Sequence, residues 1–144
     1  MNLIITDTLP DSEEFFHLFE TTGWNKDYRV NPEELFLVLK NSWFCLSGYL
    51  DNRLIGFGRI VSDGLLHAMI YDMIIHPDYQ GYGYGALILK KLLEKCQSHR
   101  IRDIQLFSAR NKMGFYKRFG FTTRPAEAQG MEIKYRISEN KEQL

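Results

Sequence analysis

Three glycines at alternate positions mark the part of the sequence best suited to bind an anion. They stand in Gln80-Gly81-Tyr82-Gly83-Tyr84-Gly85, between a strand-like run and residues 86–96, whose apolar spacing is typical of a helix. The first N–H groups of a helix have no partner within it, and the helix dipole adds positive potential there. Glycines let the main chain approach a phosphate closely. The segment therefore predicts a phosphate-binding loop, with an ordinary tight turn as the alternative.

The spacing of these glycines excludes two common nucleotide-binding loops. No Gly-Lys-Ser or Gly-Lys-Thr is present, which excludes a P-loop. The interval from Gly83 to Gly85 is too short for G-x-G-x-x-G, and Asp103 precedes a predicted strand where a ribose-binding acid should end one. A dinucleotide-dependent oxidoreductase is therefore disfavoured.

Other residue types that do chemistry are scattered along the sequence. His17, His67, His76 and His99 lie in unrelated predicted elements, and no pair has the helical spacing of metal ligands. We therefore predict no metal. No Ser/His/Asp elbow or Cys/His pair stands out, so nothing supports a covalent intermediate on the enzyme.

The first half of the chain predicts one strand, two helices and a three-stranded antiparallel meander. Acids in the first turn open one helix at residues 11–14, and Gly23 ends it. Asn31 as N-cap and Pro32 at the first position open the next helix, which runs to about Lys40. The predicted strands are residues 3–6, 43–50, 54–61 and 67–75, with turns at residues 51–52 and 62–64.

The second half predicts helices over residues 86–96 and 111–118 and strands over residues 104–107 and 131–135. The order is then β-α-α-β-β-β-α-β-α-β. This order predicts an α/β (α+β) fold, with a mixed, mostly antiparallel central sheet flanked by helices and a right-handed crossover after the glycine segment. At 144 residues, we expect a single domain spanning residues 1–144.

Composition narrows the class of protein further. The net charge is zero, which argues against a nucleic-acid partner. No stretch approaches the ~20 apolar residues of a membrane span, and the N-terminus lacks the pattern of a signal peptide. Two cysteines, Cys45 and Cys96, are too few for a disulfide scaffold. We therefore expect a cytoplasmic protein with reduced thiols and no membrane partner.

The balanced charge conceals an asymmetry along the chain. Residues 1–89 hold 5 Lys/Arg against 12 Asp/Glu, whereas residues 90–144 hold 13 against 6. Two solvated surfaces of different charge would explain this. The alternative is a cationic ligand held by the first part of the chain and an anionic ligand held by the second.

Two motifs resemble those of the GCN5-related N-acetyltransferases. Gln80-x-x-Gly83-x-Gly85 matches the Q/R-x-x-G-x-G/A pyrophosphate loop of that family. The segment Phe115-Tyr116-Lys117-Arg118-Phe119-Gly120-Phe121 is similar to its later FY…GF segment. The order of elements matches as well, so the resemblance covers nearly the whole chain. A finer likeness, to the plant serotonin N-acetyltransferase type and its small bacterial relatives, is weak evidence about the acceptor.

The resemblance implies acetyl-CoA as co-substrate, lying along residues 74–85. The main chain of Met73, Ile74 and Ile75 would pair with pantetheine like an added strand, and one N–H would polarise the thioester carbonyl. The Gln80 side chain and the N–H groups of residues 81–86 would hold the pyrophosphate. The residues implied in donor binding beyond that strand are Gln80, Gly81, Tyr82, Gly83, Tyr84, Gly85, Ala86, Asn111, Lys112, Phe115 and Tyr116.

The same resemblance assigns roles in the reaction. Tyr116 would face the sulfur and stabilise the departing thiolate by a hydrogen bond. Full proton transfer is uphill by roughly 2 kcal/mol, because a phenol of pKa ~10 is a weaker acid than a thiol of pKa ~8.5. Asp72 would accept the proton of the amine or only orient its ammonium form. Trp24, Tyr28 and Asp72 would line the acceptor site.

We therefore expect an N-acetyltransferase that moves an acetyl group from acetyl-CoA to the primary amine of a small molecule, by direct attack in a ternary complex. Two alternatives stay open: a protein lysine or N-terminal acetyltransferase, and a CoA-binding sensor module without turnover. A homodimer is common in the family, but the sequence carries no interface signal for one.

Overall fold

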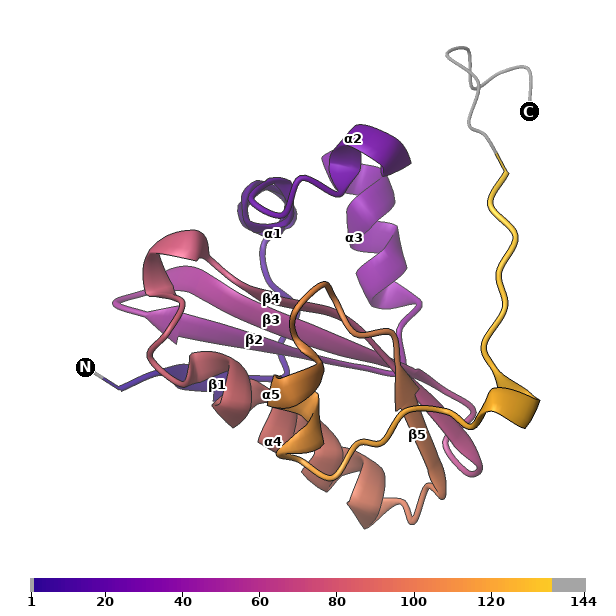
Figure 1. Ribbon diagram of the computed structural model, residues 1–144. Coiled ribbons are helices and arrows are strands. Elements are labelled where there is room, and N and C mark those ends of the chain that lie inside the picture. The colour runs from indigo at the N-terminus through magenta and orange to yellow at the C-terminus, as the bar shows by residue number, and fades with distance from the viewer. Residues whose placement is uncertain (1, 136–144) are drawn as a thin grey trace. The chain divides into compact units, whose positions relative to one another are not determined.

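The computed structural model describes residues 2–135 and divides the chain into two compact units, with the boundary between Phe107 and Ser108 (Figure 1). The elements of the first unit are β1 (Ile4–Thr6), α1 (Ser12–Glu20), α2 (Asn25–Tyr28), α3 (Pro32–Lys40), β2 (Phe44–Leu50), β3 (Arg53–Ser62), β4 (His67–Ile75), the 3-10 helix η1 (Pro77–Tyr79), α4 (Tyr84–Ser98) and β5 (Asp103–Leu106). The second unit contains α5 (Met113–Lys117) and the 3-10 helix η2 (Ala126–Ala128).

The first unit is built on one five-stranded sheet with the order β1-β2-β3-β4-β5. The first four strands pair antiparallel, and β5 pairs parallel with β4. The two-residue turn between β2 and β3 places Asp51 and Asn52 at φ 47° and 62°, as a tight hairpin of this twist requires. The predicted mixed, mostly antiparallel sheet flanked by helices is confirmed.

Helices α1 and α3 begin where their capping residues predict. The Asp11 side chain accepts a hydrogen bond from the N–H of Glu14, and Asn31 forms a capping box with Glu34. Both caps satisfy N–H groups that the helix itself leaves free. Local side-chain chemistry therefore fixes the start of each helix.

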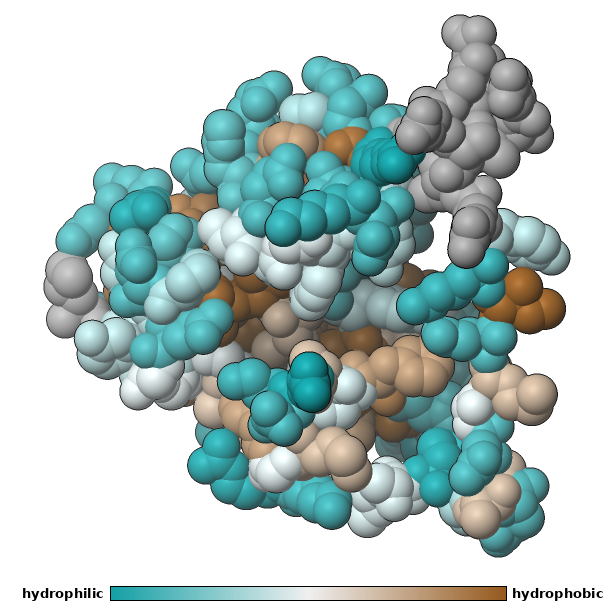
Figure 2. Space-filling view, turned by 45° about the horizontal axis from the view of Figure 1, so that its top comes forward, coloured by the Kyte–Doolittle hydropathy of each residue, from teal (hydrophilic) through white to brown (hydrophobic). Residues whose placement is uncertain are grey.

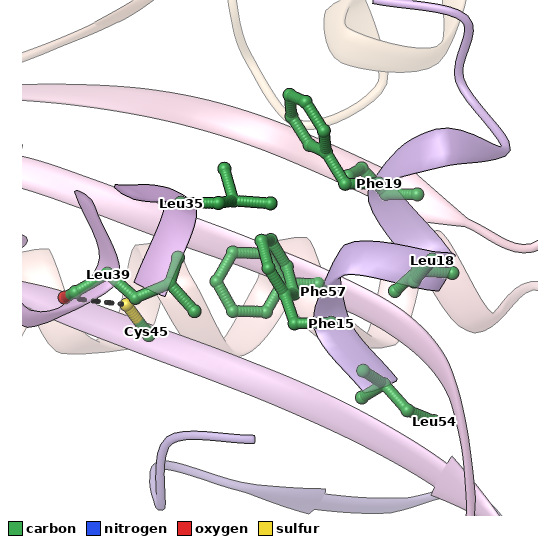
Figure 3. Packing of buried hydrophobic residues seen from close by; sticks show 9 residues of the cluster. Phe15, Leu18, Phe19, Leu35, Leu39, Cys45, Leu54 and Phe57 are labelled. Carbon is green, nitrogen blue, oxygen red and sulfur yellow. Dashed lines mark hydrogen bonds between the residues drawn. The ribbon is translucent and has the colours of Figure 1, made fainter. Parts of the chain in front are cut away.

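One face of the sheet packs against α1 and α3 (Figures 1 and 3). Phe15 of α1 lies with its ring centroid 4.4 Å from that of Phe57 of β3, and both are essentially fully buried. Leu39 of α3 packs beside them, and the Cys45 thiol donates a hydrogen bond to its carbonyl oxygen (3.7 Å). Burial raises the pKa of Cys45, so this thiol behaves as a core group.

The opposite face packs against α4 and depends on two glycines of β3. A Cβ atom on Gly58 would lie 2.7 Å from Sδ of Met73 and 2.8 Å from Cδ1 of Leu92, and one on Gly56 would lie 2.8 Å from Cδ1 of Ile88. The glycines therefore let α4 and the Met73 side chain approach the sheet more closely than any larger residue would allow.

Two differences from the prediction change the order of α-helices and strands. A short helix, α2, occupies residues 25–28, where none was predicted. No strand forms over residues 131–135, and the prediction of a last strand there is wrong. Met131, Ile133 and Tyr135 are each at least 80% exposed, so this segment buries none of the apolar surface that would hold a strand in place.

The surface is mixed in character. Figure 2 shows hydrophilic residues over most of the face it presents, with hydrophobic residues gathered in patches between them. Within residues 2–135, no helix is both long enough and apolar enough to cross a membrane.

Gly58→Ala should destabilise the fold by about 1–3 kcal/mol, because its Cβ meets both a core leucine and Met73. Gly114→Ala is the matched control, since a Cβ at that helical position meets nothing within 4 Å. Urea unfolding followed by circular dichroism measures both. A Gly58→Ala midpoint equal to that of the wild type would show that the packing here is looser than described.

Candidate functional site

The strand β4 loses one of its two neighbours halfway along its length. Its pairing with β5 runs from His67↔Asp103 to Ile70↔Leu106 and stops, whereas its pairing with β3 continues to Ile75. Residues 71–75 therefore present a main-chain edge that no strand of the first unit covers. Such an edge offers hydrogen-bonding groups to an extended ligand.

The side chains of residues 73–75 pack against the two faces of the sheet. The main-chain groups are what this part of β4 presents along its open edge. Met73 lies against Gly58 and Ile75 against Gly56, on the face that packs against α4. Ile74 belongs to the core cluster on the opposite face. The side chains of these three residues thus pack against the two faces of the sheet, and their pairing with pantetheine stays a prediction.

A β-bulge lies where the edge begins. Phe57 pairs with Ile74 and Arg59 with Tyr71, so two residues of β4, Asp72 and Met73, oppose Gly58 alone. Asp72 takes up the extra length in the left-handed region, at φ 54°. Bulges bend a strand and redirect its side chains, and they commonly occur beside active sites.

At the bulge, the side chains of Tyr71 and Asp72 both contact the guanidinium group of Arg59. Nε of Arg59 donates a hydrogen bond to Oδ2 of Asp72 (2.6 Å), and the two side chains are only 15% and 16% exposed. The guanidinium carbon lies 5.1 Å from the centroid of the Tyr71 ring, and Nη1 donates a hydrogen bond to Oγ of Ser42 (3.3 Å). Asp72 is therefore half of an ion pair, which the sequence did not predict.

The glycine loop follows β4 after the short 3-10 helix η1, and two of its glycines adopt the left-handed backbone conformation. Gly81 and Gly83 adopt φ 87° and 83°, and a Cβ on either would meet nothing within 4 Å. Gly83 is the N-cap of α4, with no side-chain cap hydrogen bond. The N–H groups of residues 83–86 donate no hydrogen bond to any part of the chain that the structure describes. Open space and free N–H groups at a helix N-terminus fit a pyrophosphate.

The side chains of the loop add different contributions. Nε2 of Gln80 donates a hydrogen bond to the carbonyl oxygen of Ile75 (2.9 Å), so Gln80 ties the loop to the end of β4. Tyr82 is 70% exposed, with its ring 6.0 Å from that of Tyr84. Ala86 lies in the first turn of α4.

The second unit carries Tyr116 in the last turn of α5. Its ring lies 5.1 Å from that of Phe115 and 5.9 Å from that of Phe121, and burial raises the pKa of Tyr116. The hydroxyl therefore stays protonated and able to donate a hydrogen bond throughout the neutral range. Asn111 (φ 64°) and Lys112, the N-cap, are exposed just before the helix. The role of Tyr116 at the sulfur stays a prediction.

The two aromatic residues predicted for the acceptor site lie around α2 and share a contact with Phe19. The Trp24 ring lies 5.9 Å from that of Phe19, and the Tyr28 ring lies 6.2 Å from it. Trp24 is half-buried, whereas Tyr28 is 57% exposed. Their part in acceptor binding stays a prediction.

Among residues 2–135, no group of three or more His, Cys, Asp and Glu side chains is placed to hold a metal ion. Sequence reasoning missed the contacts of Arg59 with Asp72, Tyr71 and Ser42. The sequence predicted the hairpin of β3 and β4, but residues 59 and 71 are found to be opposite each other only once the bulge is known.

Comparison with known proteins gives a consistent result. The family model described as Acetyltransferase (GNAT) family matches residues 8–121. The uncharacterized N-acetyltransferase ycf52 of Pyropia yezoensis is 33% identical over 123 residues, covering 82% of this chain and 68% of that protein. The histone acetyltransferase TAP1 of Glycine max is 32% identical and covers 79% of this chain, which spans about half (53%) of that protein.

Solved structures share the fold. A GNAT-family acetyltransferase of Streptococcus pneumoniae superposes with a TM-score of 0.76 at 24% identity, covering 94% of this chain and 99% of that one. The PaiA N-acetyltransferase of Thermoplasma acidophilum, solved in complex with coenzyme A, gives 0.70 at 17% identity, covering 86% and 92%.

The chain therefore belongs to the acetyltransferase (GNAT) family, as its two motifs predicted. The expected class of enzyme, an acetyltransferase, is confirmed with it. The family match covers residues 8–107 of the first unit and residues 108–121 of the second, which include α5.

Gly83→Val should abolish detectable binding of acetyl-CoA in titration calorimetry. Valine both strains the left-handed N-cap position and places a branched side chain over the free N–H groups. Gly23→Val is the matched control: it has φ 78° and equally open surroundings, but lies outside the loop. Wild-type affinity in Gly83→Val would show that the loop is only a turn.

Proposed function

We propose that this protein transfers an acetyl group from acetyl-CoA to the primary amine of a small molecule, by direct attack in a ternary complex. The proposal rests on one observation: the main-chain edge of β4 over residues 71–75 is followed, after the short 3-10 helix η1, by a glycine loop at the N-terminus of α4. In this proposal the two units act together as a single acetyltransferase domain over residues 1–144.

The edge and the loop match two chemically different parts of acetyl-CoA. Pantetheine carries amides that can pair with a strand, and in the described part of the chain β4 beyond Ile70 has no neighbouring strand on the side where β5 ended. The pyrophosphate is anionic, and the N–H groups of residues 83–86 donate no hydrogen bond within the described residues. Gln80 supports this site indirectly, because its side chain is engaged with Ile75.

The proposed reaction is an acyl transfer without a covalent enzyme intermediate. The neutral amine nitrogen attacks the thioester carbonyl carbon, a C–N bond forms, and the C–S bond breaks. An amine that arrives as an ammonium ion loses one proton before attack, at a cost of roughly 4–5 kcal/mol at pH 7. The second proton leaves the nitrogen after attack, and the thiolate takes up one proton to become free CoA.

Tyr116 would stabilise the developing thiolate by donating a hydrogen bond from its hydroxyl. Burial raises the pKa of this phenol, which makes it a weaker acid and a poorer source of a fully transferred proton. A hydrogen bond formed as charge develops on sulfur lowers the barrier without such a transfer. The proton on the thiol can then arrive later, from water.

Asp72 was expected either to take the proton of the amine or to orient its ammonium form. Its bond to Arg59 counts against the first role, because protonation of the carboxylate would give up a charge-assisted hydrogen bond. Trp24 and Tyr28, around α2, offer aromatic faces to an acceptor amine. The acidic balance of residues 1–89 supports a cationic acceptor.

A protein amine is the second candidate acceptor, since one of the relatives is named a histone acetyltransferase. For the compartment we propose the cytoplasm, which the free thiols of Cys45 and Cys96 support. Two Arabidopsis thaliana relatives are named as chloroplastic, so a reducing compartment is what the relatives and the thiols share.

Release of free thiol from acetyl-CoA tests the function against an arylalkylamine, a polyamine, glucosamine-6-phosphate and a lysine peptide. We expect release with at least one of the small amines. Release with the peptide alone would favour a protein acceptor. Binding of acetyl-CoA with no release against the whole panel would support a sensor module and contradict the proposed transfer.

Tyr116→Phe should lower kcat by about 10- to 1,000-fold and leave the affinity for acetyl-CoA nearly unchanged, as loss of a transition-state contact does. Tyr49→Phe is the matched control, because burial also raises the pKa of Tyr49, which packs against the core beneath α1 and α3. Steady-state kinetics with calorimetric affinities separate the two effects. Unchanged turnover in Tyr116→Phe would contradict the proposed stabilisation of the thiolate by this hydroxyl.

A further inference from the structure

The bulge in β4 places a residue with a Cβ atom in a backbone conformation that such residues rarely adopt. Asp72 has φ 54°, in the left-handed region, where a side chain crowds its own carbonyl oxygen. The backbone preference of this residue therefore does not by itself favour a bulge at this position. Without a restraint, β4 could shift its register against β3, and a shift of one residue moves every side chain to the other face.

The restraint comes from the partly buried Arg59. Its guanidinium contacts three groups from different parts of the first unit: the carboxylate of Asp72, the ring of Tyr71 and the hydroxyl of Ser42. Tyr71 and Asp72 are consecutive, and neighbours in a regular strand point to opposite faces. Both can contact Arg59 because the bulge redirects one of them, so these contacts favour the bulged backbone over a regular strand.

The bulge also sits at the point where β4 separates from β5. The last pair is Ile70↔Leu106, and Asp72 lies two residues further on. The conformation at Asp72 therefore sets the direction of the main chain of Met73, Ile74 and Ile75. In the proposed function these residues pair with pantetheine and polarise the thioester.

We propose that Arg59 is a positioning residue for acyl transfer, which holds the donor edge of β4 in place through its ion pair with Asp72. The carboxylate of Asp72 serves this ion pair and does not receive the proton of the amine. This role rests on the proposed binding of acetyl-CoA along β4.

Two substitutions of Asp72 separate backbone positioning from chemistry by the carboxylate. Asp72→Ala and Asp72→Gly both remove the carboxylate, but glycine adopts positive φ without strain. The alanine variant should relax away from the bulge and have to regain it on binding, which lowers affinity. We expect Asp72→Gly to bind acetyl-CoA at least about fivefold more tightly than Asp72→Ala. Equal affinity and equal turnover in the two variants would overturn the proposal.

A probe that lacks pantetheine tests where the effect is exerted. Adenosine 3′-phosphate 5′-diphosphate carries the pyrophosphate and cannot pair with β4. Its affinity should be the same in both Asp72 variants, since the loop over residues 80–85 is unchanged. Asp51→Ala and Asp51→Gly form the matched control pair: Asp51 also has positive φ (47°), but lies in the exposed turn between β2 and β3. This pair should differ in thermal stability and not in acetyl-CoA affinity.

Substitutions of Arg59 test whether it acts through Asp72. Arg59→Met should weaken acetyl-CoA binding by about tenfold, and Arg59→Lys, which keeps the charge, should recover part of the loss. In the Asp72→Gly background, Arg59→Met should add less than about a twofold effect, because the group it restrains is gone. An equal loss in both backgrounds would mean that Arg59 contacts the ligand itself, and would overturn the positioning role.

The pH dependence of kcat distinguishes a proton-accepting role of Asp72 from a positioning role. If Asp72 received the proton of the amine, Asp72→Gly would remove a limb of the pH–rate profile, whereas a positioning role keeps the shape of the profile. A wild-type protein that fails to bind acetyl-CoA would contradict the proposed function itself. A wild-type protein that binds it, with indistinguishable Asp72 variants, would contradict only the role of Arg59.

Discussion

One extra residue in β4 is the constraint on which the rest of the site depends. Because Asp72 and Met73 oppose Gly58 alone, the strand bends as it leaves β5 and exposes its main chain over residues 71–75. Donor binding in the proposed function therefore follows from a local irregularity in an otherwise regular sheet.

The two faces of the sheet support this irregularity in different ways. On one face, Gly56 and Gly58 leave room for α4, so the helix whose N-terminus closes the loop is held tightly against β3. On the other face, Phe15 and Phe57 fix α1 against the same strand. Strand β3 is thus packed on both sides, which makes it a rigid partner against which the bulge in β4 can be maintained.

The sequence predicted well those features that local chemistry decides. Asn31 and Pro32 mark a helix start and Asp51-Asn52 marks a hairpin, each through its own backbone preference. The helix predicted from residue 86 begins two residues earlier, at Tyr84, with Gly83 as its N-cap. The ion pair of Arg59 and Asp72 could not be predicted, because it depends on a bulge that shifts the register between two strands. The last strand was predicted wrongly because alternating apolar residues indicate a strand but not a partner for it.

The donor and acceptor sides of the site use different kinds of chemistry. In the proposed function the donor contacts come mostly from main-chain groups of β4 and of the loop, which tolerate sequence change as long as Gly83 keeps its conformation. Relatives about one third identical can therefore share a donor site. The predicted acceptor side consists of side chains such as Trp24 and Tyr28, which substitution alters directly. Membership of the family consequently predicts the acetyl donor far better than it predicts the amine that receives the acetyl group.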